Sequence, residues 1–528
     1  MSSKSFKVKS WELKKLCQPK FIQPEQLMRQ RKKKLIKLFD DAVSSEKRYE
    51  FQRAKHCYQK VVTLHPDSPE ADIARERIQD MQALSREKGI YQRIDANAKK
   101  ILTEIGMDIS ASPVLMALLL EADAIDMKSE NALFVPIKAD YLDTCLEAVP
   151  REMPEDPGEN AFGTGATPPF LLRPGRDDLA PASRGEFEDI VRAATEYADT
   201  LGIFSIPVAT DKSISVFESS RLMEAYFPDL KMTCTRNMSD KEAAYFENRD
   251  DWMDGTSLMT SMTFMPNMVD PFIRSAKVGN NLLLLDLTIA GASGPASPEA
   301  LLTQIHAQVL FMMMLAQTIH PGVGCVHGGI PDVLGVGGDL DYSDPGQPII
   351  NSAMARLNLW VTGFPSAQSG GSTSIVNDIP AAVEESEYSR NTLRLYGVHI
   401  LRHAMGAMGN LNYFSLEKFI EDCKRERTAR LQWLKTRHDF VVPLHLPEDP
   451  DAVSGIREIA ERGGAKNADH TLHHVDAFAR WHKVLADAGE EKTYFPDLKD
   501  AAMVNGEAVE RGPEEETIAQ LQETFLKN

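Results

Sequence analysis

Residues 1–90 form a highly charged segment in which apolar positions recur at helical spacing. The positions that match a single tetratricopeptide repeat are Leu38, Ala42, Ala54, Tyr58, Val61 and Pro66. The sequence has no second copy of this pattern, and one repeat cannot bury its own hydrophobic face. We therefore predict a helical N-terminal extension that docks on the main domain, pairs with another chain or receives a partner.

A different pattern follows. Residues 94–154 predict an amphipathic α/β segment with a short strand at 132–136, and after Pro169 short apolar stretches alternate with helical ones. The eight candidate strands are residues 162–165, 204–208, 232–235, 261–264, 282–290, 324–329, 366–371 and 404–409.

Such alternation is typical of parallel strands joined by crossover helices, and eight units fit a closed barrel better than an open sheet. We predict an α/β fold, a (β/α)8 TIM barrel that carries the helical extension. The predicted domains are the extension (1–90), the barrel with its lead-in segment (91–500) and a C-terminal tail (501–528). The active site is then expected at the carboxyl ends of the strands.

Composition narrows the possible functions. The net charge of −18 disfavours nucleic acid as a partner, because phosphate binding needs clustered Lys and Arg. The six cysteines are scattered and predict neither disulfides nor a zinc site, as expected in a reducing cytoplasm. The N-terminus lacks a signal-peptide pattern, and the apolar run 309–316 is too short to span a membrane. We expect a soluble cytoplasmic protein that binds no membrane.

Asp286 lies inside the apolar fifth strand, where an unpaired carboxylate would be costly. Two interpretations are equally open. The carboxylate faces the barrel interior and meets a cationic ligand, or it accepts backbone hydrogen bonds.

His327 lies at the end of the sixth strand, beside Cys325. These two residues are too few ligands for zinc, so we predict no metal site. His327 is a candidate for substrate contact, and a hydrogen-bonded structural role is equally open. Aromatic residues near the predicted strand tips can enclose a quaternary ammonium or serve as packing. They are Phe162, Phe204, Phe264, Tyr342 and Tyr413.

Several short motifs follow one another along the chain in a particular order and spacing. They are Phe162-Gly-Thr-Gly165, Phe204-Ser-Ile-Pro-Val208, the loop 291–295, Ala307-Gln-Val-Leu310, Leu315-Ala-Gln317, Pro321-Gly322, Gly363-Phe-Pro365, Phe414-Ser-Leu-Glu-Lys-Phe419 and His470-Thr-Leu472. Together these motifs resemble the trimethylamine methyltransferase family, the corrinoid-dependent barrels that demethylate methylamines. The resemblance covers roughly residues 90–480.

The resemblance implies transfer of an N-methyl group from a small methylated amine to the Co(I) corrinoid of a carrier protein. Archetypal members carry pyrrolysine in the loop after the seventh strand, where this chain has Ser369-Gly-Gly-Ser-Thr-Ser374, with Ser372 at or within one residue of that position. The chain therefore resembles the non-pyrrolysine branch, known for quaternary amines. The corrinoid signature D-x-H-x-x-G is incomplete, because Leu401 stands where the Asp should precede His403. We expect that the chain binds no cofactor directly and that the carrier protein supplies the corrinoid. Whether the chain forms a homo-oligomer is left open by the sequence.

Our candidate catalytic residues are Ser372 and His327. The candidate substrate contacts are Asp286, Phe162, Phe204, Phe264, Gly371 and Tyr413. The chain also departs from the family pattern at Gln308 and Gly409, where relatives often have an acidic residue, and at Asp286, where they usually have a small neutral one. These departures leave open an inactive barrel with a binding or regulatory role. A different barrel enzyme, such as a decarboxylase or lyase, is a third reading.

Overall fold

The computed structural model describes residues 24–461, except 111, 127–133, 153–160, 166, 176–178, 259–261, 265, 292, 334–340, 399 and 437–439. The predicted tail 501–528 and the motif His470-Thr-Leu472 lie outside the described residues. Tertiary contacts divide the chain into two units. The first comprises residues 1–86 and 438–443, and the second comprises 87–437 and 444–528.

The first unit contains α2 (Pro24–Lys47), α3 (Phe51–Leu64) and the beginning of α4 (Pro69–Glu104). Helices α2 and α3 pack against each other, and α3 buries Tyr58 on its apolar face. The buried Glu46 carboxylate accepts from the Tyr58 hydroxyl at 2.9 Å and pairs with Arg77 of α4. This helical hairpin is as the sequence predicts, while its assignment to a tetratricopeptide repeat stays a prediction.

The second unit begins with a lead-in segment that contains a two-stranded antiparallel sheet. Its elements are β1 (Met107–Asp108), α5 (Pro113–Glu121), β2 (Phe134–Val135) and α6 (Ala139–Ala148). The strand predicted at 132–136 thus includes β2, with residues 132 and 133 outside the described part.

An eight-stranded parallel sheet follows in the order β10-β11-β3-β5-β6-β7-β8-β9. The strands are β3 (Ala161–Gly163), β5 (Gly202–Ser205), β6 (Leu230–Thr233), β7 (Trp252–Leu258), β8 (Asn281–Ile289), β9 (Cys325–Asp332), β10 (Ala367–Ser369) and β11 (Ile400–Arg402). A parallel bridge between His327 of β9 and Ser366, directly before β10, closes the ring. The predicted (β/α)8 barrel is confirmed.

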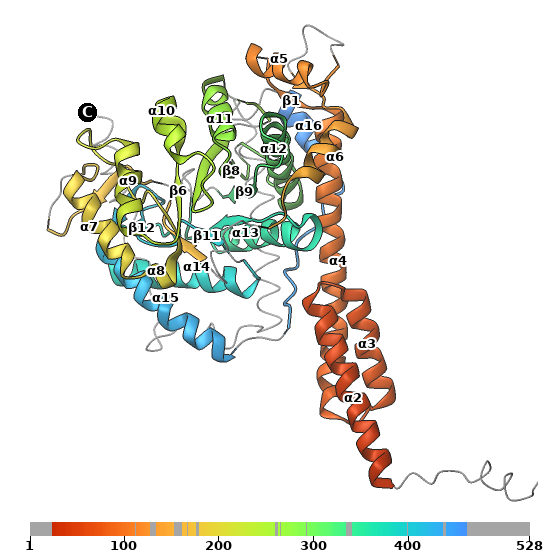
Figure 1. Cartoon of the computed structure of the whole chain (residues 1–528). Helices are drawn as coiled ribbons and strands as arrows, with labels where there is room; N and C mark the ends of the chain where they lie inside the picture. The colour runs from red at the N-terminus through yellow and green to blue at the C-terminus, as the bar shows by residue number, and fades with distance from the viewer. Residues whose placement is uncertain are drawn as a thin grey trace, which may run out of the picture. The chain divides into compact units, whose positions relative to one another are not determined.

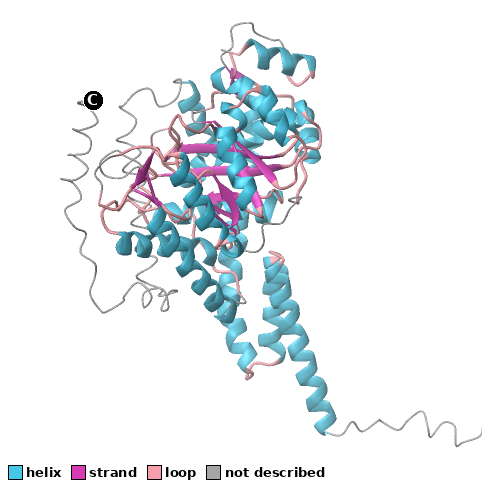
Figure 2. Ribbon diagram, turned by 60° about the vertical axis from the view of Figure 1, so that its left-hand side comes forward, coloured by secondary structure: helices cyan, strands magenta, loops and turns pink. Residues whose placement is uncertain are grey.

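Each strand is followed by a helix, and the helices cover the outside of the strands (Figures 1 and 2). They are α7 (Arg184–Thr195), α8 (Ala198–Leu201), α9 (Val216–Tyr226), α10 (Asp240–Ala243), α11 (Pro266–Val278), α12 (Pro298–Ile319), α13 (Gly346–Leu357), α14 (Ile379–Leu395) and α15 (Leu416–Thr436). Helix α16 (Ala452–Glu461) comes last in the described part. Local sequence fixes several helix starts: α7 begins with a capping box of Ser183 and Glu186.

Two of the predicted strands were misplaced. The fourth strand is β7, before the predicted 261–264, because its Asp254 obscured the apolar pattern. That carboxylate is buried and accepts from the Thr235 N–H at 3.0 Å. The eighth strand is β11, before the predicted 404–409. Within that range Ala407–Met408 form β12, which joins β13 (Tyr413–Ser415) and β4 (Phe170–Leu172) in a separate three-stranded sheet.

Helix α12 is longer than the apolar run 309–316 suggested. It spans 22 residues, and its buried polar side chains include Gln304, His306 and Gln308. By length and composition it could cross a membrane, but its apolar window lies wholly inside the protein. It is therefore a core helix of the barrel.

One layer of side chains fills the barrel interior. Every strand contributes to it: Ala161, Ile203, Leu230, Met232, Met253, Leu283, Val326, Ala367 and Ile400. Because side chains alternate along a strand, this layer identifies the inward-facing positions nearer the carboxyl ends.

Candidate functional site

The carboxyl end of the barrel interior is partly accessible to solvent. On β8, Leu283 faces inward, so Leu285, Leu287 and Ile289 face inward as well. These three are only half-buried, whereas the alternating Asp286 and Thr288 are buried. In this class of fold, the carboxyl end is where active sites lie.

A charged group and two small residues meet at this end. Ile400 faces inward, so Arg402, which ends β11, does too. A methyl group at Gly165 would lie 3.2 Å from Arg402 Nη2 and 3.0 Å from Ser205 Oγ. Gly165 thus leaves room between a guanidinium and a hydroxyl. Burial lowers the pKa of Arg402 to about 10, so it stays a cation at neutral pH.

A second polar group surrounds Tyr342. Its hydroxyl donates to Asp332 Oδ2 at 3.1 Å, and Gln347 of α13 donates to the other carboxylate oxygen at 3.4 Å. Burial raises the pKa of Asp332 to about 7. The Tyr342 ring lies edge-on to His403, with 6.3 Å between centroids, and His403 Nδ1 is 2.8 Å from Ser369 Oγ. A carboxyl group, a phenol and an imidazole thus lie together at the carboxyl end of the barrel.

Ser372 and Gly371 follow β10 at the same end. Gly371 has a φ of +88°, and a Cβ there would lie 2.8 Å from the Ala404 carbonyl oxygen and 2.9 Å from Arg390 Cγ, so only glycine fits. The Ser372 hydroxyl is buried and has no hydrogen-bond partner in the described part of the chain. The structure thus brings these two predicted residues to the carboxyl end, while their roles stay predictions.

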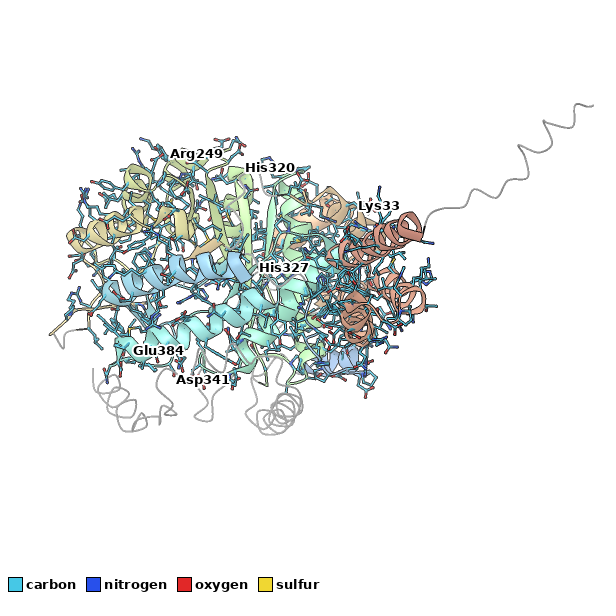
Figure 3. The ribbon with its side chains drawn as sticks, turned by 90° about the horizontal axis from the view of Figure 1, so that it is seen from below. Lys33, Arg249, His320, His327, Asp341 and Glu384 are labelled. Carbon is cyan, nitrogen blue, oxygen red and sulfur yellow. The ribbon has the colours of Figure 1, made fainter. Side chains whose placement is uncertain are left out.

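His327 points outward from β9, toward α12. Its Nε2 lies 3.0 Å from His306 Nδ1, and His306 Nε2 lies 3.0 Å from Asp95 Oδ1 of α4. The Gly329 N–H donates to His327 Nδ1, so the Nε2 hydrogen of His327 donates to His306, which donates to Asp95. His327 is buried, and Figure 3 labels it near the middle of the view. This is the hydrogen-bonded structural alternative and not contact with a substrate inside the barrel.

This arrangement should make stability sensitive to acid. Burial and the neighbouring His306 lower the pKa of His327 well below 6.5. Below the unfolded-state pKa, the unfolded chain binds a proton that the folded chain does not, so stability falls as the pH drops below about 6.5.

We expect His327→Gln, which keeps a donor but does not titrate, to cost about 1 kcal/mol at pH 7. In urea unfolding experiments, the difference in free energy of unfolding between this variant and the unmutated protein should shrink from pH 6.5 to pH 5. His56→Gln, at an exposed histidine of α3, is the control. A difference that does not depend on pH would contradict the assignment.

Asp286 also faces the helices and not the interior. Its carboxylate accepts from the Gln308 side chain of α12 and from the Thr288 hydroxyl, whose oxygen is 3.1 Å away. Gln308 in turn accepts from the Met262 N–H at 2.5 Å. Asp286 and Gln308, two positions at which the chain departs from the family pattern, are thus hydrogen-bonded to each other. This placement removes the physical basis for a contact between Asp286 and a substrate in the interior.

The predicted aromatic contacts lie elsewhere too. Phe162 and Phe204 pack in the cluster between strands and helices, with Phe204 5.0 Å from Phe227 between ring centroids. Phe264 packs against Phe272 in another outer cluster. Tyr413 lies in the three-stranded sheet. Its ring occupies the space beside Gly409, where a Cβ would come within 2.6 Å. The structure therefore assigns the three phenylalanines to packing.

The structure also places at the carboxyl end two residues that the sequence analysis does not single out, Asp332 and Arg402. It places there Tyr342, one of the candidate aromatic residues, and His403, which belongs to the incomplete corrinoid signature. The sequence carries a signal for Arg402, which directly follows the apolar residues Ile400 and Leu401, but not for Asp332, which follows Gly-Gly-Ile-Pro. The described residues contain no group of three or more His, Cys, Asp or Glu side chains that could hold a metal.

The architecture defines a (β/α)8-barrel protein whose polar groups gather at the end where such barrels act. Residues 249–494 match the model of the trimethylamine methyltransferase (MTTB) family. The resemblance that the sequence motifs indicate is thereby confirmed.

Among curated proteins, the chain is similar to a glycine betaine methyltransferase of Desulfitobacterium hafniense (strain Y51). They are 24% identical over 363 residues, which are 63% of this chain and 73% of the relative. Among solved structures it is similar to the Methanosarcina barkeri monomethylamine methyltransferase MtmB, with a TM-score of 0.41 and 8% identity, over 76% of this chain and 87% of the other. The hydroxylamine complex of MtmB gives a TM-score of 0.38, 8% identity, and 76% and 94% coverage.

Proposed function

We propose that this chain transfers an N-methyl group from a betaine-like quaternary amine to the Co(I) corrinoid of a separate carrier protein. The observation that carries the proposal is the similarity to a glycine betaine methyltransferase over 73% of that relative. In the reaction the N–CH3 bond breaks, its electron pair stays on nitrogen, and the product is a neutral tertiary amine. The carrier's cobalt supplies the nucleophile that accepts the methyl group.

The barrel then has to bind, orient and desolvate the substrate. Its inner wall at the carboxyl end is apolar along Leu285 and Leu287, which suits the methyl groups of an ammonium. Asp332 and Tyr342, which are buried and hydrogen-bonded to each other, place a carboxyl group and an aromatic ring at the same end. Holding the N–CH3 bond in line with the acceptor and excluding water are the main sources of rate in such a displacement.

The proposal assigns the corrinoid to the partner because, within the described residues, the two positions of the incomplete corrinoid signature do not fit a resident corrinoid. His403 is buried, and its Nδ1 is engaged by Ser369. Leu401, at the position of the missing Asp, is packed in an apolar cluster. Neither side chain is presented for attachment of a large cofactor.

The test is an assay with a reduced corrinoid carrier protein and three amines: glycine betaine, choline and trimethylamine. We expect demethylation of a quaternary amine, seen as the appearance of the demethylated product, and little or none of trimethylamine. A tertiary amine needs an activating electrophile, and Ser372 offers no imine. Trimethylamine turnover equal to that of the quaternary amines would refute this choice. Binding without turnover would instead favour the inactive, regulatory alternative.

A further inference from the structure

Among the described residues, every buried Lys and Arg side chain except one forms an ion pair with a carboxylate. The paired side chains are Arg77, Lys231, Arg356, Arg390, Arg394 and Lys418. Arg356, for example, lies 2.8 Å from Glu87. Arg402 is the exception. It is only 6% exposed, and within the described part of the chain it forms no ion pair and its Nε has no hydrogen-bond partner.

An unpaired buried guanidinium is costly, because burial removes its hydration and nothing replaces it. Burial is what lowers the pKa of Arg402, and the neighbour that opposes this shift is the Tyr342 phenol, not a carboxylate. A buried cation that forms no ion pair within the described residues, at the end of the barrel where active sites lie, is a candidate for binding an anionic ligand.

The surroundings of Arg402 fit a small ligand. The side chain lies one inward position beyond Ile400 of the interior layer, and Gly165 leaves the space between its guanidinium and Ser205 unfilled by a side chain. A guanidinium at this depth is reached by a carboxylate on a small molecule more easily than by a group on a large partner protein. The planar fork of Arg also matches the two oxygens of a carboxylate.

We propose that Arg402 binds the carboxylate of a zwitterionic substrate and so selects betaines over quaternary amines that lack a carboxylate. This rests on the function proposed above and adds the substrate class. With the carboxylate at Arg402, the ammonium end is left to the apolar wall and to the Asp332–Tyr342 pair.

The test is calorimetric binding to the whole chain without carrier protein, using glycine betaine and choline as probes. The unmutated protein should bind glycine betaine more tightly than choline. Arg402→Gln should lose about tenfold to a hundredfold in affinity for glycine betaine and keep its affinity for choline within a few fold. Arg402→Lys should retain part of the preference. Arg356→Lys, at a buried arginine that is already paired, should leave the preference intact.

Folding is checked by thermal unfolding. Arg402→Gln should unfold at the same temperature as the unmutated protein or a higher one, because it removes an unpaired buried charge. Equal losses for both probes, unchanged glycine betaine affinity in Arg402→Gln, or no preference in the unmutated protein would each overturn the proposal. Arg402-dependent binding without demethylation would leave this inference standing and reject methyl transfer. Demethylation of glycine betaine and choline with equal affinity for both would support methyl transfer and reject the role of Arg402.

Discussion

We expect Asp422→Ala to lower the free energy of unfolding by about 3 to 5 kcal/mol, because it removes a carboxylate that pairs with two buried cations. Asp422 of α15 pairs with Arg390 at 3.2 Å and with Lys418 at 2.7 Å, and all three side chains are fully buried. Its Oδ2 also accepts from the Gly406 N–H at 2.9 Å. Removing the carboxylate therefore leaves the Lys418 ammonium and one backbone donor without their acceptor, while Arg390 keeps the Glu426 carboxylate, 3.6 Å away.

The measurement is urea unfolding of the purified variants. Asp422→Asn keeps the volume and part of the hydrogen bonding, so it separates the loss of charge from the loss of packing. Glu421→Ala is the matched control on the same helix, since the exposed Glu421–Lys424 pair should contribute less than about 1 kcal/mol. Equal losses for Asp422→Ala and Glu421→Ala would contradict a structural role for the buried network.

This network also bears on the site. Arg390 donates to the Ala404 carbonyl at 2.9 Å, and Asp422 holds Gly406, so both ends of the loop after Arg402 and His403 are fixed from α14 and α15. Loosening that loop should displace the two side chains that the barrel places at its carboxyl end. Glycine betaine binding should therefore weaken in folded Asp422→Asn as well.

The alternation of short apolar stretches and helices was enough to predict the barrel, because a parallel strand buried on both faces has a simple apolar signature. Strands that depart from this signature were misplaced. In β7, Asp254 interrupts the apolar run, and only the tertiary structure supplies the Thr235 donors that make its burial acceptable. In β11, the strand is three residues long, and the small residues after it imitate a strand.

The site was harder to predict, because function depends on which face of a strand a residue occupies. A shift of one position moves a side chain from the interior to the helix layer. His327 and Asp286 were singled out for their chemistry, yet both face α12, where His306 and Gln308 bind them. The sequence does not distinguish Arg402, because an arginine after an apolar run is common and only the structure shows that it forms no ion pair within the described residues.

The second large effect on the free energy of unfolding is expected at Asp286. Burial raises the pKa of this carboxyl from 3.8 to about 8, so at pH 7 the folded protein holds a proton that the unfolded chain has released. Stability from this group is fully present below pH 3.8 and is lost as the pH rises toward 8. The limiting slope is about 1.4 kcal/mol per pH unit for one proton.

Asp286→Asn mimics the protonated carboxyl and does not titrate, so it should be nearly neutral below pH 3.8, already stabilising at pH 5 and most stabilising at about pH 8. Urea unfolding at intervals from pH 5 to pH 9 should show the variant gaining on the unmutated protein up to about pH 8 and then levelling off. Asp189→Asn, at an exposed carboxylate of α7, should show no such trend. A variant that is destabilised equally at every pH would mean that Asp286 is ionised in the folded protein. In that case the bonds from Gln308 and Thr288 outweigh its burial.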